Sequence, residues 1–320
     1  MVLTRRGMIF GLLGAGLCST QAWAKGLQVE GGLAFGSSWR ITAGGIVDLS
    51  AVRPKLEAVF RRVDEQMSPY RATSPLSVFN SIRRVGFAEM PPELCAVTSE
   101  ALRIARLTDG AFDPTVGPLV SRFGFGPIRG GLGSYRQIEV ASDGLRKGEA
   151  DLTLDLCGIA KGYALDRVAE VLVDEGINSA MIEVGGEIKV LGRHPRGREW
   201  VGAVADPIAL DFQPYRLVTP RDQALATSGH AANGVSGRIS TSHIIDTTSG
   251  RPASTTLASV SVLAPSGQEA DALATALCAA GVEKGIALAR RLNASALFIV
   301  RNGDETSDVM TGRFSDYVLI

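Results

Sequence analysis

Residues 155–167 read DLCGIAKGYALDR, and our interpretation of the chain starts from this stretch. The alternating residues just before it, Ala150 to Asp155, predict a strand. Tyr163 to Glu175, which begin within the stretch and continue past its end, carry apolar side chains at helical spacing. A short turn with two glycines therefore leads into the start of a helix, where backbone N–H groups have no partner within the helix and the positive end of the dipole points outward. Such a turn predicts an anion site.

The residue types in the turn favour a phosphate group as the anion. Lys161 adds a mobile cation, and Gly158 and Gly162 allow an anionic group to approach the backbone closely. The alternative is that the glycines serve only the tight geometry of the turn. The stretch matches neither the P-loop nor the Gly-x-Gly-x-x-Gly pattern, so its spacing alone does not choose between the two interpretations.

The composition is that of a globular protein without net charge. The chain has 320 residues, of which 45% are hydrophobic and 21% charged, and its 33 Lys and Arg residues balance its 33 Asp and Glu residues. This length suits one large domain or two closely packed ones. Because proteins that bind nucleic acid or anionic membranes need a basic surface, the balance argues against both functions, and no nucleic-acid partner is expected.

The first 24 residues predict an export signal rather than a part of the fold. Arg5 and Arg6 precede an apolar run, and a small-x-small cleavage pattern ends at Ala24. An uncleaved membrane anchor is the alternative, but the apolar run is short for spanning a bilayer. A twin-arginine leader predicts transport of the folded protein to the bacterial periplasm. We therefore expect a signal peptide over residues 1–24 and one domain over residues 25–320.

The cysteines predict neither a disulfide framework nor a zinc site. Cleavage would leave Cys95, Cys157 and Cys278, an odd number at wide spacing. We expect all three to pack as small apolar residues, although Cys157 adjoins the predicted anion site.

Apolar patterning and turn residues predict the other elements. A helix is expected to begin at Pro54, and a second helix to span Leu94 to Thr108 and end at Asp109-Gly110. The predicted strands are Leu27 to Trp39, Ile41 to Leu49, two strands within Ser179 to Val190 around Gly185-Gly186-Glu187, Trp200 to Pro207, Ala296 to Arg301 and Phe314 to Ile320.

Four further segments carry residue patterns of their own. They read MSPYRATSPLSVFN at 67–80, AFDPTVGPL at 111–119, SHIIDTTSGRP at 242–252 and QEADALATAL at 268–277.

The last two segments contain residues that suit catalysis by their chemistry. On a helix, Asp271 and Thr275 are four residues apart and lie on one face, so their oxygens can bind a hard cation; the alternative is that Asp271 only caps the helix. A histidine side chain ordinarily titrates near neutral pH, so His243 is expected to be able to accept a proton from an attacking hydroxyl. Asp246 follows three positions later, and since side chains three apart on a strand face opposite sides, a direct pair with His243 does not follow from the spacing.

Together with residues 155–167, these segments resemble the motifs of the ApbE family of FAD:protein FMN transferases, in the same order along the chain. The resemblance covers about residues 40–300. The sequence departs from the usual residues of that family at Pro75, Asp109, Cys157 and Thr247.

The resemblance implies that FAD lies between the loops of Tyr70 and Asp113 and the central turn, with its pyrophosphate near Lys161. In this family the loop that matches residues 111–113 holds the adenine and ribose end of FAD, and Tyr70 would lie against the flavin or cap the pocket. The alternatives are a half-buried loop tyrosine and a turn-forming aspartate. The implied cofactor-binding residues are Tyr70, Ala111, Phe112, Asp113, Gly158, Lys161 and Gly162.

The resemblance also implies a metal site. The family holds Mg²⁺ with the aspartate and threonine of its last motif and with a backbone carbonyl of the glycine-containing turn. The matching groups are the side chains of Asp271 and Thr275 and the carbonyl of Ala160.

The implied reaction is the Mg²⁺-dependent transfer of FMN from FAD to a Ser or Thr hydroxyl of a target flavoprotein, with release of AMP. His243 or Asp246 would take the proton of the attacking hydroxyl, and Lys161 would lie beside the pyrophosphate, where positive charge assists such transfers. Two other functions stay open, namely an FAD pyrophosphatase and a periplasmic FAD-binding protein without transferase activity.

The implied fold is α+β and related to the T-fold, with a mostly antiparallel core, flanking helices, a smaller lobe and no Rossmann domain. The leader resembles that of the branch of the family linked to maturation of nitrous-oxide reductase, which implies a membrane-bound electron-transfer flavoprotein as the target.

Overall fold

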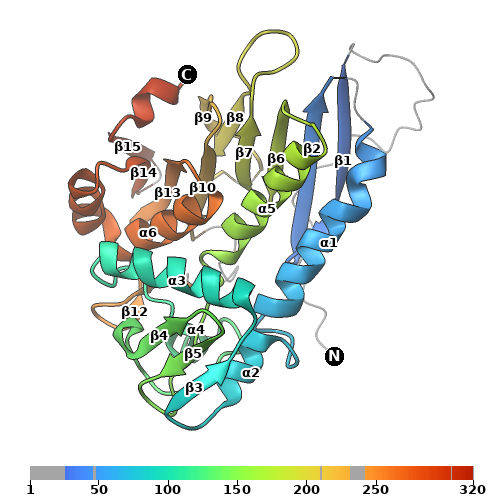
Figure 1. Ribbon diagram of the computed structural model, residues 1–320. Coiled ribbons are helices and arrows are strands. Elements are labelled where there is room, and N and C mark those ends of the chain that lie inside the picture. The colour runs from blue at the N-terminus through green and yellow to red at the C-terminus, as the bar shows by residue number, and fades with distance from the viewer. Residues whose placement is uncertain (1–25, 46–47, 210, 231–241, 304, 320) are drawn as a thin grey trace, which may run out of the picture.

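The computed structural model describes residues 26–45, 48–209, 211–230, 242–303 and 305–319. The predicted signal peptide lies outside these residues. The described chain has the expected α+β fold, with a large sheet, helices on one face of it and a smaller lobe beside it (Figure 1). Every strand pair among the described residues is antiparallel, so these sheets contain no parallel unit of the Rossmann type.

The main sheet has the strand order β1-β2-β6-β7-β10-β13-β14-β15. The two halves of the sheet meet where β7 pairs with β10. The strands are β1 (Leu27–Ala34), β2 (Ser37–Gly44), β6 (Ala180–Val184), β7 (Glu187–Leu191), β10 (Ala224–Gly229), β13 (Leu257–Ala264), β14 (Ser295–Asn302) and β15 (Glu305–Thr311).

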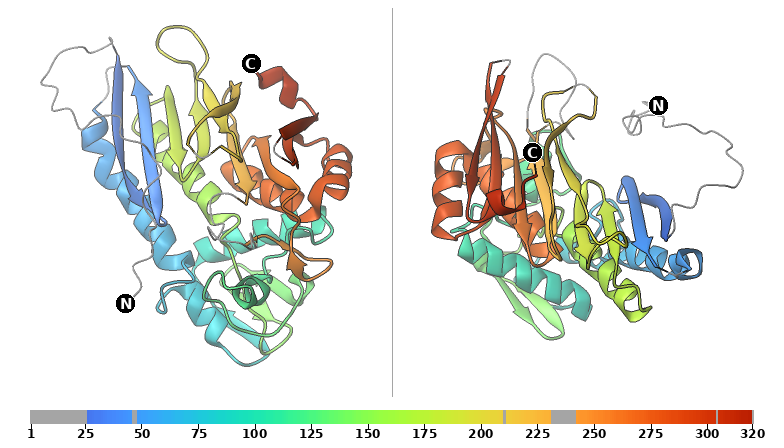
Figure 2. Two further views of the ribbon diagram at one scale, coloured as in Figure 1. Left: turned by 180° about the vertical axis from the view of Figure 1, so that it is seen from behind. Right: turned by 90° about the horizontal axis from the view of Figure 1, so that it is seen from above.

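Helices cover one face of this sheet, and short elements cover the other (Figures 1 and 2). The covering helices are α1 (Leu49–Met67), α5 (Ala160–Asp174) and α6 (Gly267–Arg291). The opposite face carries β8 (Gly202–Ala205), β9 (Pro214–Val218) and the short helix η2 (Phe314–Tyr317).

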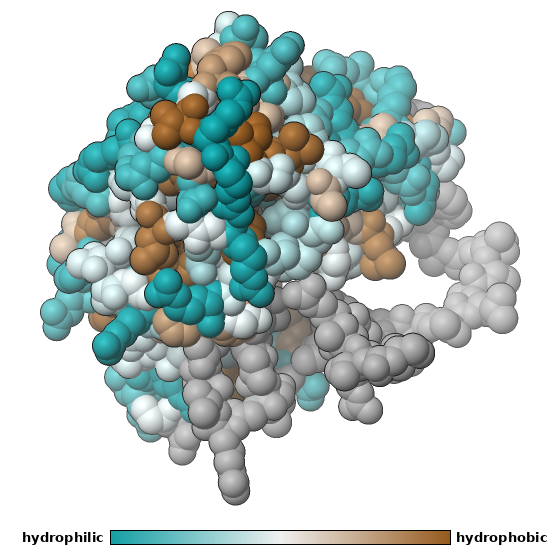
Figure 3. Space-filling model, turned by 90° about the horizontal axis from the view of Figure 1, so that it is seen from below, coloured by the Kyte–Doolittle hydropathy of each residue, from teal (hydrophilic) through white to brown (hydrophobic). Residues whose placement is uncertain are grey.

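The smaller lobe packs below the sheet, with α3 (Pro92–Leu107) between the two (Figure 1). Seen from below, the molecule shows hydrophilic residues over much of its surface and hydrophobic residues in separate patches (Figure 3). The lobe and its neighbouring hairpin consist of α2 (Pro75–Ser81), β3 (Gly86–Glu89), α4 (Gly117–Arg122), η1 (Tyr135–Gln137), β4 (Ile138–Ala141), β5 (Gly144–Lys147), β11 (Ile245–Asp246) and β12 (Arg251–Pro252).

Alternation along the strands builds a hydrophobic core on each face of the sheet. In β14, Ala296 and Phe298 point into the core under the helices, whereas Leu297 and Ile299 point into the core on the opposite face. α6 is long and apolar enough to cross a membrane, but half of its most apolar stretch is buried in the protein, as in a core helix.

Several predicted elements are confirmed with shifted ends. The predicted strands around Gly185-Gly186 are β6 and β7, and the predicted helix after the central turn is α5, which begins three residues earlier than expected. The helix expected from Pro54 begins at Leu49 instead, because the Asp48 side chain accepts hydrogen bonds from the backbone of Ser50 and Ala51 and caps the helix there.

Three predictions were wrong. Ala150 to Asp155 is not a strand of any sheet, because the backbone of Leu154 pairs with a side chain instead of another strand. The segment from Phe314 forms the short helix η2 rather than a strand. Cys157 is exposed, whereas Cys95 and Cys278 are buried as expected.

The helices α5 and α6 cross in backbone contact. A methyl group added at Gly162 would lie 2.1 Å from the carbonyl oxygen of Gly267, and one added at Gly267 would lie 2.4 Å from the carbonyl oxygen of Gly162. Only glycine fits at either position unless the helices move apart. This contact fixes the start of α5 against the start of α6.

We predict that Gly162→Ala lowers the free energy of unfolding by about 2 kcal/mol or more, because the new methyl group meets backbone atoms that cannot rotate away. Urea denaturation measures the change. The matched control is Gly202→Ala in β8, where the nearest atom is the end of the Ile188 side chain at 3.0 Å and can adjust. Equal losses in the two variants would rule out the helix crossing as the cause.

Candidate active site

The extended segment before α5 is fixed by a side chain from α2. The Asn80 amide donates to the Leu154 carbonyl at 2.8 Å and accepts from the Leu154 N–H at 2.7 Å, as a neighbouring strand would. The next residue, Asp155, donates its N–H to the carbonyl of Pro114 at 2.6 Å. The central turn, residues 155–162, is therefore held beside residues 111–119 of the smaller lobe, which we call the lobe loop. Asn80 ended one of the quoted segments, but its role was missed because its partner is 74 residues away.

Asp271 of α6 caps the start of α5. The N-cap residue of α5, Ile159, makes no side-chain hydrogen bond to the helix, and Asp271 Oδ2 instead accepts the N–H of Gly162 at 3.0 Å. Asp271 is 3% exposed, and this burial raises the pKa of its carboxyl although the charge of Lys161 acts to lower it. The predicted alternative role of Asp271, capping its own helix, is not what the structure shows.

Thr275 lies one turn further along α6, against the central turn. Its Oγ1 is 3.1 Å from Ser228 Oγ at the end of β10. A methyl group added at Gly158 would lie 3.2 Å from Thr275 Oγ1 and 3.1 Å from the ring of Phe112. The turn, Thr275 and the lobe loop therefore meet at Gly158.

Lys161 pairs with a buried glutamate. Its Nζ forms an ion pair with Glu187 Oε1, and the Glu187 side chain is only 2% exposed. Burial raises the pKa of Glu187 to about 7 despite the nearby ammonium. Burial acts to lower the pKa of Lys161, but the charges of Glu187 and Asp271 outweigh it and the pKa is raised, so Lys161 is a cation in the physiological range. Glu187 is the first residue of β7, and its side chain faces Lys161.

The lobe loop is ordered around Asp113. Its Oδ1 accepts the N–H and the hydroxyl of Thr115 at 2.8 and 2.7 Å, and its Oδ2 accepts the N–H of Tyr135 at 3.3 Å. Burial raises the pKa of Asp113. The neighbouring Phe112 is buried. The turn-forming role of Asp113 is confirmed, and its contact with a ribose stays a prediction.

His243 lies in the segment before β11 and is partly buried. Its ring is 6.0 Å from the ring of Phe125 in an edge-on arrangement. Burial, together with the charges of His230 and Lys161, lowers the pKa of His243 to about 4. The imidazole is therefore neutral at pH 7 and able to accept a proton.

The roles of the remaining predicted residues stay predictions. Tyr70 is 62% exposed on the turn after α1, so its ring is open to a ligand. Asp246 Oδ1 accepts the N–H of Thr248 at 2.9 Å within the β11–β12 turn. Ala111 is partly buried against the main core, and Ala160 is the first residue of α5.

The donor atoms at the start of α5 suit a hard cation. Among the described residues, no three His, Cys, Asp or Glu side chains lie close enough to form a metal site by themselves. The predicted metal-binding groups, the Asp271 carboxylate, the Thr275 hydroxyl and the Ala160 carbonyl, would instead form a site made only of oxygen atoms. Since Mg²⁺ is commonly held by one or two carboxylates with substrate phosphates and water, this donor set fits Mg²⁺ when a phosphate-containing substrate is bound.

A separate hollow opens on the outer side of the lobe loop. Its volume is about 410 Å³, and it is lined by Arg106, Asp109, Tyr135, Arg136 and Ile138. None of these lining residues is a predicted catalytic or metal-binding residue. We therefore place the candidate active site at the start of α5, where Gly158, Gly162, Asp271 and Thr275 meet, and not in this hollow.

The sequence and the fold both match known flavin transferases. The profile of the ApbE family matches residues 35–298. The FAD:protein FMN transferase of Vibrio cholerae is 34% identical over 289 residues, which cover 86% of this chain and 86% of that protein. The FAD:protein FMN transferase of Escherichia coli K12 is 31% identical over 310 residues, which cover 90% of this chain and 88% of that protein.

Two solved structures have similar folds. The flavin transferase ApbE from Vibrio cholerae matches with a TM-score of 0.81 and 32% identity, over 91% of this chain and 99% of that chain. The apo form of the Pseudomonas stutzeri flavinyl transferase ApbE matches with a TM-score of 0.81 and 31% identity, over 91% of this chain and 96% of that chain.

We predict that NMR titration of the folded protein gives a midpoint for His243 near pH 4, because its surroundings disfavour the charged ring. The chain has three histidines, so one-residue variants assign the signals. An unfolded histidine titrates near 6.5, so between these values the unfolded chain binds a proton that folded His243 does not. His243 therefore makes the free energy of unfolding fall as pH falls from about 6.5 to 4, and His243→Gln removes this share. A midpoint near 6.5 would contradict the buried site.

Proposed function

The chain belongs to the ApbE family, and from this premise we propose that it is an Mg²⁺-dependent enzyme that transfers FMN from FAD to a Ser or Thr hydroxyl of a target flavoprotein. AMP is the second product. The observation that carries this proposal is the meeting of Lys161, Asp271 and Thr275 with the lobe loop at the start of α5. Such a meeting provides positive charge, metal ligands and a nucleotide-binding loop in one place.

The start of α5 would receive the pyrophosphate of FAD. The helix dipole and the Lys161 ammonium both favour an anion there, although the Gly162 N–H already donates to Asp271. Glu187 holds Lys161 on one side, so the ammonium has a fixed position before substrate binds. Mg²⁺ bound by Asp271, Thr275 and the Ala160 carbonyl would neutralise further phosphate charge.

The transfer step needs one acceptor of a proton. The oxygen of the Ser or Thr hydroxyl forms a bond to the phosphorus on the FMN side, and the bond from that phosphorus to the oxygen of AMP breaks. His243, whose imidazole is neutral at pH 7, takes the hydroxyl proton, or Asp246 does so. Positioning and charge neutralisation supply most of what such a reaction requires.

Two of the four departures from the usual family residues, Asp109 and Thr247, fit the local structure, which supports a transferase over a protein that only binds FAD. Asp109 has a φ of 52°, a left-handed conformation that explains the usual glycine and that aspartate tolerates. The Thr247 hydroxyl donates to the carbonyl of Gly110 at 2.7 Å and so ties the His243 segment to the lobe loop.

The place of action and the target also belong to this proposal. The twin-arginine pattern supports export to the periplasm, and it lies outside the described residues. A membrane-bound electron-transfer flavoprotein with an acceptor Ser or Thr is the proposed target.

We predict that the mature chain, incubated with FAD, Mg²⁺ and a periplasmic flavoprotein domain, adds the mass of FMN to one Ser or Thr of that domain and releases AMP. Asp271→Asn should slow this by about 100-fold or more, since it removes a charged metal ligand but keeps an oxygen that can accept the Gly162 N–H. Mass spectrometry of the domain and chromatography of the nucleotides measure both.

Different products in this assay would support one of the two alternative functions. Free FMN and AMP without a modified domain, repeated over several candidate domains, would support the FAD pyrophosphatase. Bound FAD without any turnover would support a flavin-binding protein. Full activity of Asp271→Asn would contradict the metal assignment.

A further inference from the structure

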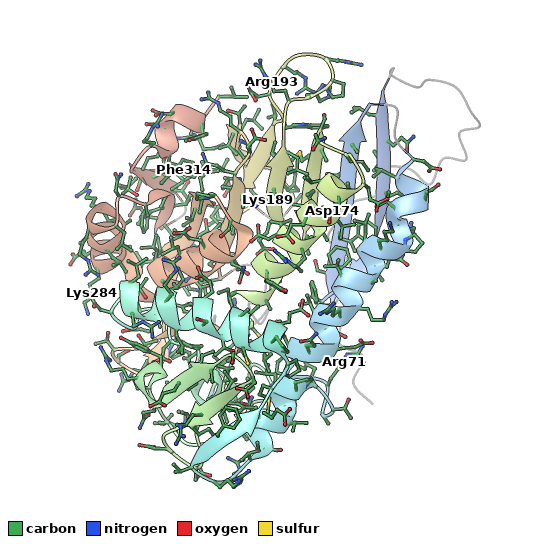
Figure 4. All side chains as sticks on the ribbon, viewed as in Figure 1. Arg71, Asp174, Lys189, Arg193, Lys284 and Phe314 are labelled. Carbon is green, nitrogen blue, oxygen red and sulfur yellow. The ribbon has the colours of Figure 1, made fainter. Side chains whose placement is uncertain are left out.

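A second buried carboxylate lies where α5, α6 and β7 meet. Asp166 Oδ1 accepts from Lys189 Nζ at 2.6 Å and from the N–H of Gly267 at 2.8 Å, and its Oδ2 accepts the N–H of Gln268 at 3.1 Å. Lys189 Nζ also donates to the carbonyl of Pro265 at 3.1 Å. The two charged side chains are only 10% and 13% exposed. Figure 4 shows Lys189 near the middle of the sheet, between α5 and α6.

These contacts complete the cap of α6. The first two N–H groups of this helix, those of Gly267 and Gln268, donate to Asp166, and the third, that of Glu269, donates to the side chain of the N-cap residue Ser266 at 3.2 Å. A helix start has no acceptors of its own for these groups. The position of the first turn of α6 is therefore set by a residue of α5.

The two helices cap each other in the same way. On α5, Gly162 is followed four residues later by Asp166, and on α6, Gly267 is followed four residues later by Asp271. The glycines form the crossing, Asp166 accepts the N–H of Gly267, and Asp271 accepts the N–H of Gly162. Each aspartate thus fixes the other helix beside the crossing.

The two aspartates differ in their counter-charge. Asp166 has the Lys189 ammonium in direct contact. Among the described residues, Asp271 has no Lys or Arg within ion-pair distance, and it belongs to the proposed metal site. Asp166 is thus paired with a lysine of the protein itself, whereas the Asp271 carboxylate is available to a cation from solution.

We propose that Asp166 and Lys189 are positioning residues for the Mg²⁺ site: they hold α6 so that Asp271 and Thr275 lie correctly at the start of α5. This inference rests on the proposed function. Neither residue touches the metal or the substrate. Loss of the pair frees the first turn of α6, four residues before Asp271, and changes the spacing of the metal ligands.

The effect falls on metal binding more than on turnover. Groups that orient metal ligands are commonly worth about 10–100-fold in metal affinity. We expect the half-saturating Mg²⁺ concentration to rise about 10-fold or more when the pair is lost, and the turnover number at saturating Mg²⁺ to stay within about 3-fold.

Two variants and one control test the proposal. Asp166→Asn keeps the size of the side chain but leaves the Lys189 ammonium buried without a counter-charge. The double variant Asp166→Asn/Lys189→Met removes both charges, and it is used if the single variant folds poorly. The control, Asp308→Asn, breaks the ion pair of Asp308 with Arg216, which is 2.9 Å long and lies away from the site on β15 and β9. The two readouts are the rise in Tm that Mg²⁺ causes in the presence of FAD, and the Mg²⁺ dependence of FMN transfer.

The expected result is a smaller Mg²⁺-induced rise in Tm and a higher half-saturating concentration in the Asp166 variants, and wild-type Mg²⁺ behaviour in the control. Half-saturation within about 2-fold of wild type, with only a loss of Tm like that of the control, would overturn the inference, because the pair would then stabilise the fold alone. A wild-type chain that does not respond to Mg²⁺ would instead overturn the metal in the proposed function, and this inference with it.

Discussion

The structure depends on the backbone contact between Gly162 of α5 and Gly267 of α6. Because no side chain separates the helices, the exposed N–H groups of each start lie within reach of a carboxylate on the other. The same contact brings Thr275 against the turn before α5. A larger residue at the crossing would separate the anion-binding turn from the proposed metal ligands, so the close packing of the helices and the composition of the site have one cause.

The sheet supports this crossing through two charges on β7. Glu187 and Lys189 are two residues apart and point to the helix face, whereas Ile188 and Val190 pack in the core on the other face. Glu187 on the strand pairs with Lys161 on α5, and Lys189 on the strand pairs with Asp166 on α5. Each charge on β7 therefore faces a charge of the opposite sign on the helix. A shift of β7 by one residue would bury Ile188 and Val190 against these charges instead. The ion pairs therefore fix the register of the helix on the sheet as well as the position of Lys161.

Local patterns predicted the elements, but they did not predict the partners of the side chains. The helix after the central turn and the strands around Gly185 follow from periodicity, and the proposed metal and phosphate residues followed from the motifs. Asp166 stood within the quoted stretch without a role, because the N–H groups that it caps are 101 and 102 residues away. The supposed strand before the turn pairs with the Asn80 side chain, which no strand pattern reveals. A local sequence pattern does not contain these partners, because tertiary packing brings them together from distant parts of the chain.

Charge balance supports the proposal that one of the buried carboxylates binds a metal. Three carboxylates, those of Asp166, Glu187 and Asp271, are buried between the sheet and the two helices. Burial of an ionised carboxylate is costly unless a cation or several hydrogen-bond donors compensate it. Lysines compensate the first two by direct contact, whereas among the described residues Asp271 receives only a backbone N–H and the more distant charge of Lys161. A divalent cation at Asp271 would supply the missing charge and would at the same time attract the phosphates of the substrate. Of these three carboxylates, only that of Asp271 lacks a lysine in direct contact, and it lies where the proposed chemistry needs a metal.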